Sequence, residues 1–224
     1  MPPGQVPYFS VIIPSRLRHD RLAALLRSLV KCSYPQDRFE VIVIDEASGS
    51  PPRAVLAPFS GHLTLAMIEL GIGGLARARN AGSKHAHGDF LAFIDEDCTP
   101  TSDWLNALGT RAATAPGAAI VGRTVNALPT KLTSEATQAL LDFHSIHYRR
   151  DATHAEIFSA SNLAIPANAF RELGGFDESM ELAHASEVEF CHRWVKSGRQ
   201  VNFLEEAVVL DAHTPSIRSY FREH

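Results

Sequence analysis

Three consecutive acidic residues, Asp95-Glu96-Asp97, directly follow the apolar run FLAFI. The run has the composition of a buried strand, so the acids stand beyond its carboxyl end, where ligands bind in open α/β sheets. Adjacent carboxylates repel one another there unless a cation compensates them. A hard divalent cation takes oxygen ligands and could also bridge a diphosphate. The triplet therefore indicates a metal site, against the alternative of an acidic turn in solvent.

Polar residues close two other apolar segments in the same way. Asp45 ends the segment FEVIVID, and Pro14-Ser15-Arg16 closes YFSVIIP. Because parallel strands end at one edge of a sheet, these residues and the acid triplet predict one shared crevice. Asp45 also suits an Asx-turn that leaves the strand, so a structural role stays open for it.

A third segment is glycine-rich and then basic, with the sequence GGLARARN at residues 73–80. It has neither the P-loop pattern nor the GxGxxG pattern of dinucleotide sites. By itself it indicates the start of a helix that carries two arginines, and a plain surface position suits Arg77.

Short apolar strands alternate with amphipathic helices over the first 125 residues. Leu22, Leu25, Leu26 and Leu29 recur at helical spacing, after Asp20 as a candidate N-cap. Nearly all-apolar strands suit a parallel sheet that is covered on both faces, with right-handed crossovers. The predicted fold class is α/β, an open and mostly parallel sheet with helices on both faces. The expected strands span residues 8–14, 39–45, 63–70, 90–95 and 118–125, and the expected helices follow at about 22–29, 74–87 and 102–115.

The second part of the chain is less regular, and no repeat, low-complexity stretch or linker interrupts it. We expect a single domain over residues 1–224, with one half to about 125 and a second half from about 126. In the second half the pattern predicts helices at 133–148, 167–173 and 186–197, and extended segments at 158–166, 200–204 and 207–210.

The composition excludes several classes of protein. The 224 residues are 45% hydrophobic, enough for a core without disulfides, and a net charge of −4 argues against a nucleic-acid binder. No apolar run approaches the roughly 18 residues of a membrane span, and the first seven residues do not resemble a signal peptide. Three distant cysteines suit a reducing compartment. We expect a cytoplasmic globular domain, with peripheral membrane association left open.

Six segments together resemble the inverting family 2 nucleotide-sugar glycosyltransferases, which have the GT-A fold. In chain order they are FSVIIPS, FEVIVIDEASGS, ARARNAGSKHAHGDFLAFIDEDC, FSASNLAIP, ELGGFDE and SEVEFCHRW. They extend from about Tyr8 to His213, nearly the whole chain. Each motif is loose, but six in order are specific for the family, although not for a substrate. The resemblance implies sugar transfer with inversion from a nucleoside-diphosphate sugar, with UDP-sugars favoured, to a saccharide or other hydroxyl acceptor.

By this resemblance the first half of the chain binds the nucleotide. Pro14 and Arg16 would border the base pocket, and Asp45 would contact the base or the ribose. Arg79 and Asn80 match the Arg-Asn pair that relatives place near the nucleotide.

The acid triplet matches the DXD motif of the family. The match implies that Asp97 binds Mg²⁺ or Mn²⁺ directly, that Asp95 contacts the ribose or the metal, and that Glu96 lies in the same nucleotide site. His213 follows the last strand, where many relatives place a third metal contact; Mn²⁺ accepts histidine better than Mg²⁺ does. A single histidine is often only a packed or surface residue. Asn162 would lie beside the donor sugar, or would only shape a strand-to-helix turn.

The resemblance places the acceptor and the catalytic base in the second half. Relatives carry Glu-Asp, one residue and a second acid, where this chain has SEVE. Ser186 and Glu189 also form a capping-box sequence, which predicts that a helix starts at this point. Glu187, at the first helical position, is then the candidate base, with Asp177 or Glu181 as alternatives.

Two other functions stay open from the sequence. The altered SEVE motif suits a non-catalytic relative that binds a nucleotide sugar or a protein partner. A sugar nucleotidyltransferase is disfavoured, because the first strand is not followed by a glycine-rich loop with Lys or Arg. Slow hydrolysis of a nucleotide sugar without acceptor would separate an enzyme from a binding module.

Overall fold

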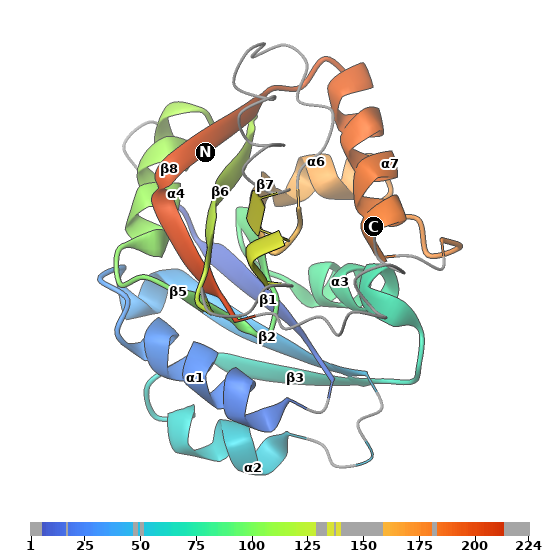
Figure 1. Cartoon of the computed structure of the whole chain (residues 1–224). Helices are drawn as coiled ribbons and strands as arrows, with labels where there is room; N and C mark the ends of the chain where they lie inside the picture. Colours follow the sequence, from blue (N-terminus) through green and yellow to red (C-terminus); the bar gives the residue numbers. More distant parts are fainter. Residues whose placement is uncertain are drawn as a thin grey trace.

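In the computed structural model the strands form one eight-stranded sheet, and the helices lie between them along the chain (Figure 1). The structure describes residues 6–16, 18–46, 49, 52–128, 134–136, 138–139, 159–180 and 183–212. The strand order is β3-β2-β1-β4-β7-β6-β8-β5. The strands are β1 (Phe9–Ser15), β2 (Phe39–Glu46), β3 (Leu65–Leu70), β4 (Phe90–Ile94), β5 (Cys98–Pro100), β6 (Ala119–Asn126), β7 (Asn162–Pro166) and β8 (Val201–Asp211).

The first four strands of the sheet are parallel and the rest are mixed. β1 pairs in parallel with β2 and β4, and β2 pairs in parallel with β3. β7 runs antiparallel to β4 and β6, β8 runs parallel to β6, and β5 runs antiparallel to β8. The carboxyl ends of β1, β2 and β4 therefore meet at one edge, as the sequence predicts for a crevice.

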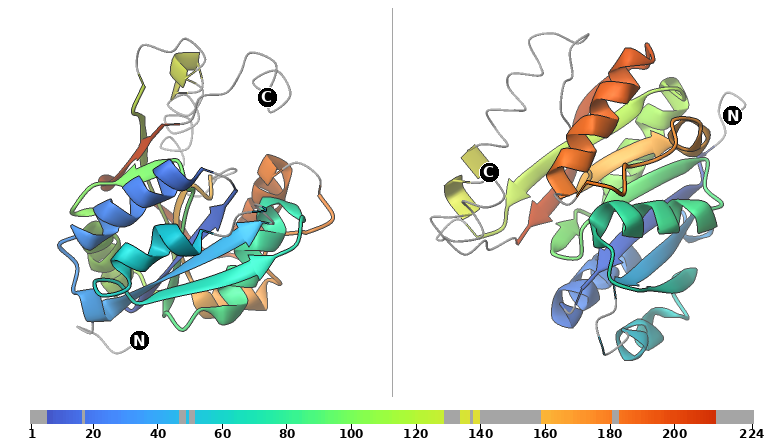
Figure 2. Two further views of the ribbon diagram at one scale, coloured as in Figure 1. Left: turned by 90° about the horizontal axis from the view of Figure 1, so that it is seen from below. Right: turned by 90° about the vertical axis from the view of Figure 1, so that its right-hand side faces the viewer.

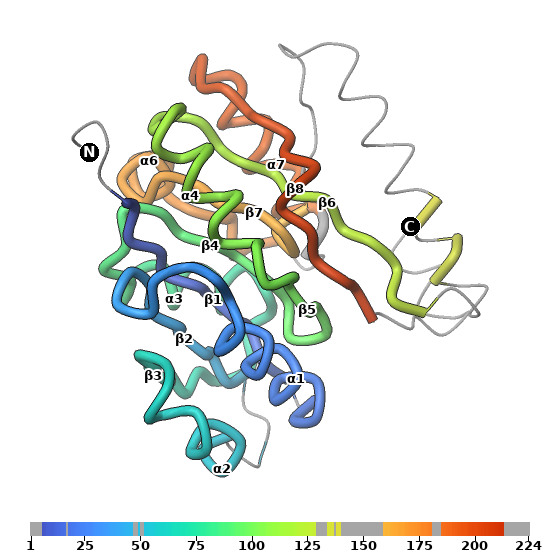
Figure 3. The backbone as a smooth tube through the Cα atoms, turned by 90° about the vertical axis from the view of Figure 1, so that its left-hand side faces the viewer, coloured from blue at the N-terminus to red at the C-terminus, as the bar shows by residue number. Residues whose placement is uncertain are grey.

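Helices cover both faces of this sheet. One face carries α1 (His19–Val30), α2 (Arg53–Leu56) and α4 (Trp104–Thr114), and the other carries α3 (Gly74–His85), α6 (Ala167–Glu172) and α7 (Ala183–Lys196). Figure 2 shows α3 and α7 across one face in its right-hand view, and Figure 3 shows α1, α2 and α4 from the opposite side. Two short 3₁₀ helices span Gln36–Arg38 and Ala57–Phe59. Within the described residues, every helix is too short or too polar to cross a bilayer.

Strand alternation distributes the core between the two faces. Val11 and Ile13 pack in the cluster on the α1 side, whereas Ile12 packs in the cluster on the α3 side. The four leucines predicted for one face of α1 are all fully buried. The predicted α/β class with helices on both faces is thus confirmed.

The structure differs from the sequence-based elements at several places. The two strands predicted at 200–204 and 207–210 are one continuous strand, β8. In it Leu204 pairs with Gly122 and Val208 with Arg123, so an irregularity replaces the predicted break. The short strand β5 was not predicted. Asp20 lies inside the first turn of α1 and is not its N-cap, because the helix already begins at His19. Most of the helix predicted at 133–148 lies outside the described residues.

A buried carboxylate holds the amino-terminal edge of the parallel strands together. Glu40 is 7% exposed and accepts hydrogen bonds from the Ser10 hydroxyl at 2.6 Å and the His87 backbone N–H at 2.7 Å. The Gly88 N–H in turn donates to Ser10 Oγ at 2.8 Å. Burial alone would raise the pKa of Glu40, but the hydrogen bonds from Ser10 and His87 outweigh it, so the pKa lies below its usual value.

We predict that Glu40→Gln lowers the free energy of unfolding by about 1–2 kcal/mol at pH 7, because charge-assisted hydrogen bonds are lost. A depressed folded-state pKa stabilises the fold above the unfolded value of about 4.3 and loses this effect as the pH falls through the folded value. Urea unfolding at pH 7 and pH 3.5 should therefore give a smaller difference from wild type at the acid pH. Glu69→Gln, at an exposed position of β3, is the control. An equal difference at both pH values would contradict the prediction.

Candidate functional site

A cavity of about 710 Å³ opens at the carboxyl edge of the parallel strands. The ends of β1, β2 and β4 line it, together with the start of α3 and the segment between α6 and α7. The cavity brings together five residues that the sequence assigned to the nucleotide or the metal: Pro14, Arg16, Asp95, Glu96 and Asp97.

Five acidic side chains and two arginines lie in the lining of the cavity. Burial raises the pKa of Glu46, and the nearby guanidinium groups of Arg16 and Arg79 offset this only in part. Burial likewise raises the pKa of Glu96, although its carboxylate accepts hydrogen bonds from the Ser15 hydroxyl at 2.8 Å and the Arg16 N–H at 3.0 Å. The crowded acids make this edge a favourable place for a further cation.

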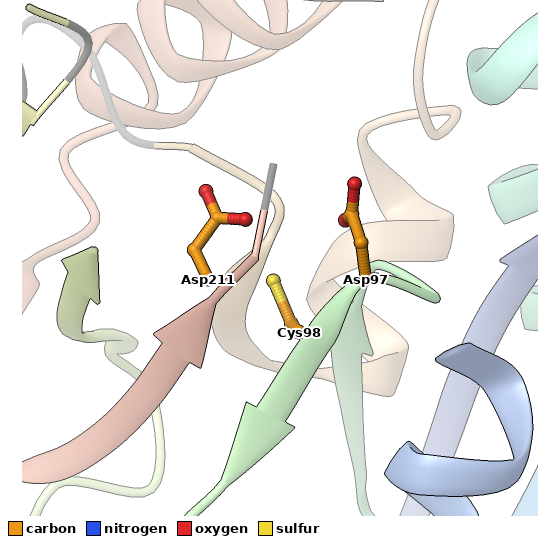
Figure 4. Close-up of side chains that lie close together, drawn as sticks. All are labelled: Asp97, Cys98 and Asp211. Carbon is orange, nitrogen blue, oxygen red and sulfur yellow. The ribbon is translucent and has the colours of Figure 1, made fainter. Parts of the chain in front are cut away.

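Asp97 lies where two distant parts of the chain meet. Its backbone carbonyl accepts a hydrogen bond from the Ala212 N–H at 3.0 Å, and Cys98 pairs with Asp211 across β5 and β8. Side-chain ligand atoms of Asp97, Cys98 and Asp211 lie within 4.8 Å of one another. Figure 4 shows both carboxylates on the same side of the two strands, with the Cys98 sulfur between them.

This donor set fits a hard divalent cation through its two carboxylates. Burial raises the pKa of the Cys98 thiol well above its usual value. A hard cation also prefers oxygen ligands to sulfur, so the two carboxylates are the better ligands. Asp211 was missed by the sequence analysis. The signal that could have identified Asp211 as a candidate ligand is its position at the end of the last strand, two residues before His213. His213 itself lies outside the described residues.

Arg79 is the centre of a buried ion-pair network beside the cavity. Its side chain is 1% exposed, with Nη1 at 2.6 Å from Glu187 Oε1 and Nη2 at 2.9 Å from Asp95 Oδ1. Burial alone would lower the pKa of Arg79, but Asp95 and Glu187 more than reverse this and raise it. Burial raises the pKa of Asp95, which Arg79 offsets in part. The network links α3, the end of β4 and α7.

Glu187, the candidate base, does not lie in the cavity lining. It is 5% exposed, and besides the contact with Arg79 its Oε2 accepts a hydrogen bond from the Ala160 N–H at 3.1 Å. The capping-box prediction is wrong, because α7 begins at Ala183 and therefore contains Ser186 in its interior. Glu187 is the fifth residue of the helix, and Ser186 is fully buried.

The two asparagines taken from the resemblance make structural contacts. The Asn80 amide donates to the Phe176 carbonyl at 2.8 Å and to Glu178 Oε1 at 2.9 Å. The Asn162 amide donates to the Ala207 carbonyl at 3.0 Å, and its oxygen accepts from Trp104 Nε1 at 2.9 Å. Both asparagines lie outside the cavity lining, so a role at the nucleotide or the sugar stays a prediction.

Two acids in the cavity were missed by the sequence analysis. β2 extends one residue beyond its predicted end, and Glu46 lies in the lining while the neighbouring Asp45, 3% exposed, does not. Alternation along a strand turns successive side chains to opposite sides. Glu178 lines the cavity from the segment between α6 and α7. The role of Asp45 at the nucleoside stays a prediction.

Comparisons with known proteins identify a matching family and several relatives. The model for glycosyl transferase family 2 matches residues 10–174. Glycosyltransferase AglE of Haloferax volcanii is 25% identical over 91% of this chain and 66% of its own length. The pre-mycofactocin glycosyltransferase of Mycobacterium tuberculosis is 28% identical over 94% of this chain and 44% of its own length.

Two solved structures share the fold. Mannosyltransferase PcManGT from Pyrobaculum calidifontis, in complex with GDP-Man and Mn²⁺, has a TM-score of 0.73 at 22% identity, over 99% of this chain and 62% of that one. TarS 1–349 of S. aureus, in complex with UDP-GlcNAc, has a TM-score of 0.73 at 17% identity, over 93% of this chain and 59% of that one. The chain spans between 44% and 66% of the length of these four proteins.

We predict that Glu187→Gln lowers the free energy of unfolding by about 3 kcal/mol, because it removes one partner of a buried ion pair. Glu189→Gln is the matched control, since Glu189 lies on the same helix and pairs with Arg193 at a more exposed position. It should cost about 1 kcal/mol or less. Urea unfolding measures both, and equal losses would show that the Arg79 contact contributes little to stability.

Proposed function

The chain belongs to glycosyl transferase family 2, and on that basis we propose that it transfers a sugar from a nucleoside-diphosphate sugar to an acceptor hydroxyl, with inversion and with a divalent cation. The observation that carries the proposal is the acid triplet, which directly follows β4 and lines the cavity. The relatives described above are glycosyltransferases, which favours this reaction over the nucleotidyltransferase alternative.

The cavity lining includes apolar and basic side chains, which suit the different parts of such a donor. Pro14, Ile72 and Leu75 offer apolar surface for a nucleobase, and Arg16 and Arg18 offer positive charge for phosphates. We favour a UDP-sugar. TarS is solved with UDP-GlcNAc and PcManGT with GDP-Man, so both donors are to be tested.

Asp97 and Asp211 are the residues that we propose hold Mn²⁺ or Mg²⁺, with His213 and Asp95 as further ligands expected from the family resemblance. When bound, the cation would act as a Lewis acid that neutralises the leaving nucleoside diphosphate. The protein's own contribution is to hold the two carboxylates together, through the pairing of β5 with β8 and the hydrogen bond between Asp97 and Ala212.

Inverting transfer also needs a carboxylate that takes the proton of the attacking hydroxyl. Glu187 remains our proposal for this base. Its carboxylate is linked through Arg79 to Asp95, the acid that follows β4 and lines the cavity.

Of the alternatives predicted from the sequence, Asp177 does not line the cavity and Glu181 lies outside the described residues. Glu178 is a further candidate, because it lines the cavity and the Asn80 amide donates to its Oε1 at 2.9 Å.

We predict that Asp97→Ala removes the Mn²⁺-dependent part of nucleoside-diphosphate binding. Calorimetric titration of UDP and of GDP, each with Mn²⁺ or with a chelator, should show tighter binding with Mn²⁺ for wild type. The variant should lose about tenfold or more of affinity with Mn²⁺, roughly 1.4 kcal/mol, and little with the chelator. Asp103→Ala, outside the cavity, is the control. Equal wild-type affinity with Mn²⁺ and with chelator would overturn the metal assignment.

A second prediction concerns the base and the non-catalytic alternative. Wild type should slowly hydrolyse the nucleotide sugar that it binds, with water as the acceptor. If Glu187 is the base, Glu187→Gln should slow hydrolysis by about 10²–10⁴-fold, measured well below its melting temperature, while Glu178→Gln should change it much less. The reverse pattern would assign the base to Glu178. Donor binding by wild type with no hydrolysis would favour the binding module.

A further inference from the structure

Asp97, the central metal candidate, already has cationic partners from α1 and the segment before it. Arg18 and Arg21 both direct Nη1 to Asp97 Oδ2, Arg18 in a close ion pair and Arg21 at 3.5 Å. The Asp97 side chain is only 8% exposed, whereas the Arg18 side chain is 46% exposed, so solvent screens their ion pair in part. The positive charge that a divalent cation would bring to Asp97 is therefore supplied in part by arginine.

The two arginines differ in how firmly they are held. Arg21 Nη1 also donates to the Ala212 carbonyl at 2.6 Å, which anchors it to the segment after β8, and Arg21 does not line the cavity. Arg18 lines the cavity, and its side chain is 46% exposed. Of the two ion pairs of Asp97, the one with Arg18 is therefore the one that a ligand in the cavity can reach.

We propose that Arg18 is an exchangeable counter-cation of the site: it competes with the divalent ion for Asp97 and, once displaced, pairs with the diphosphate of the donor. This inference rests on the proposed function. A guanidinium suits both partners, because its planar fork binds carboxylate and phosphate oxygens alike. Asp97 is then paired with Arg18 before the donor binds and with the metal ion afterwards, when Arg18 pairs with the diphosphate.

The exchange has a consequence that a merely structural arginine would not have. Breaking the Arg18–Asp97 pair costs free energy when the metal binds alone, and the diphosphate returns that free energy by giving Arg18 a new partner. Loss of Arg18 should therefore strengthen the binding of the metal alone and weaken the binding of the metal–diphosphate complex. Opposite signs in the two measurements are the signature of the proposal.

The test uses Arg18→Gln in the full chain, with Mn²⁺ alone as the first probe. Binding of Mn²⁺ is followed by the loss of the electron paramagnetic resonance signal of the free ion. The variant should bind Mn²⁺ about three- to tenfold more tightly than wild type, because a cationic competitor is gone. UDP and GDP, each titrated with saturating Mn²⁺, should bind about fivefold or more weakly.

Two further variants act as controls. Arg16→Gln removes the same charge from the same cavity, but the Arg16 side chain has no ion pair with Asp97 among the described contacts, so its effect on Mn²⁺ alone should be about twofold at most. Arg18→Lys keeps the charge and should lie between wild type and Arg18→Gln. Melting curves check that all variants are folded.

The outcomes separate this inference from the proposed function. If wild type binds Mn²⁺ and Arg18→Gln binds it no more tightly, the exchange is wrong while the metal site stands. If both affinities fall together in Arg18→Gln, Arg18 only supports the site and the exchange is again wrong. If wild type binds no Mn²⁺, with or without UDP or GDP, the metal-dependent function and the exchange both fail.

Discussion

The two ion pairs of the buried Arg79 guanidinium are the interaction on which the rest of the site depends. Arg79 contacts Asp95 at the end of β4 and Glu187 on α7, while its own backbone belongs to α3. An arginine that is 1% exposed is tolerated only when its charge is matched, so the two carboxylates are needed for α3 to pack here. The Phe176 ring, 5.8 Å from the guanidinium, adds an aromatic face to the same enclosure. One side chain thus joins the two halves of the domain.

The three residues of the acid triplet have different partners. Asp95 is directed to Arg79, Glu96 to Ser15 and the Arg16 N–H, and Asp97 to the arginines of α1 and the segment before it. Three neighbouring acids can be held together because each has its own positive or hydrogen-bonding partner. Asp97 pairs with Arg18, which lines the cavity and is 46% exposed, and we propose that Asp97 exchanges this protein cation for a metal ion.

Much of the fold could be predicted because its signals are local. The apolar runs and the leucine spacing of residues 22–29 depend only on neighbours in the chain, and the first four strands of the sheet followed from them. Predictions failed where a local pattern competed with packing. The SEVE sequence has the form of a capping box, yet α7 begins at Ala183, and Ser186 and Glu187 are buried inside the helix.

The sequence by itself determined the fold class, the family resemblance and the acid triplet at the edge of the sheet, since strand ends and their side chains are encoded within short segments. Only the tertiary structure decided which groups meet. Asp211 reaches Asp97 through the antiparallel pairing of β5 with β8, more than a hundred residues apart along the chain. Arg79 and Glu187 are likewise 108 residues apart. Such contacts arise from the burial of charge and the register of distant strands, and no local pattern in the sequence records either.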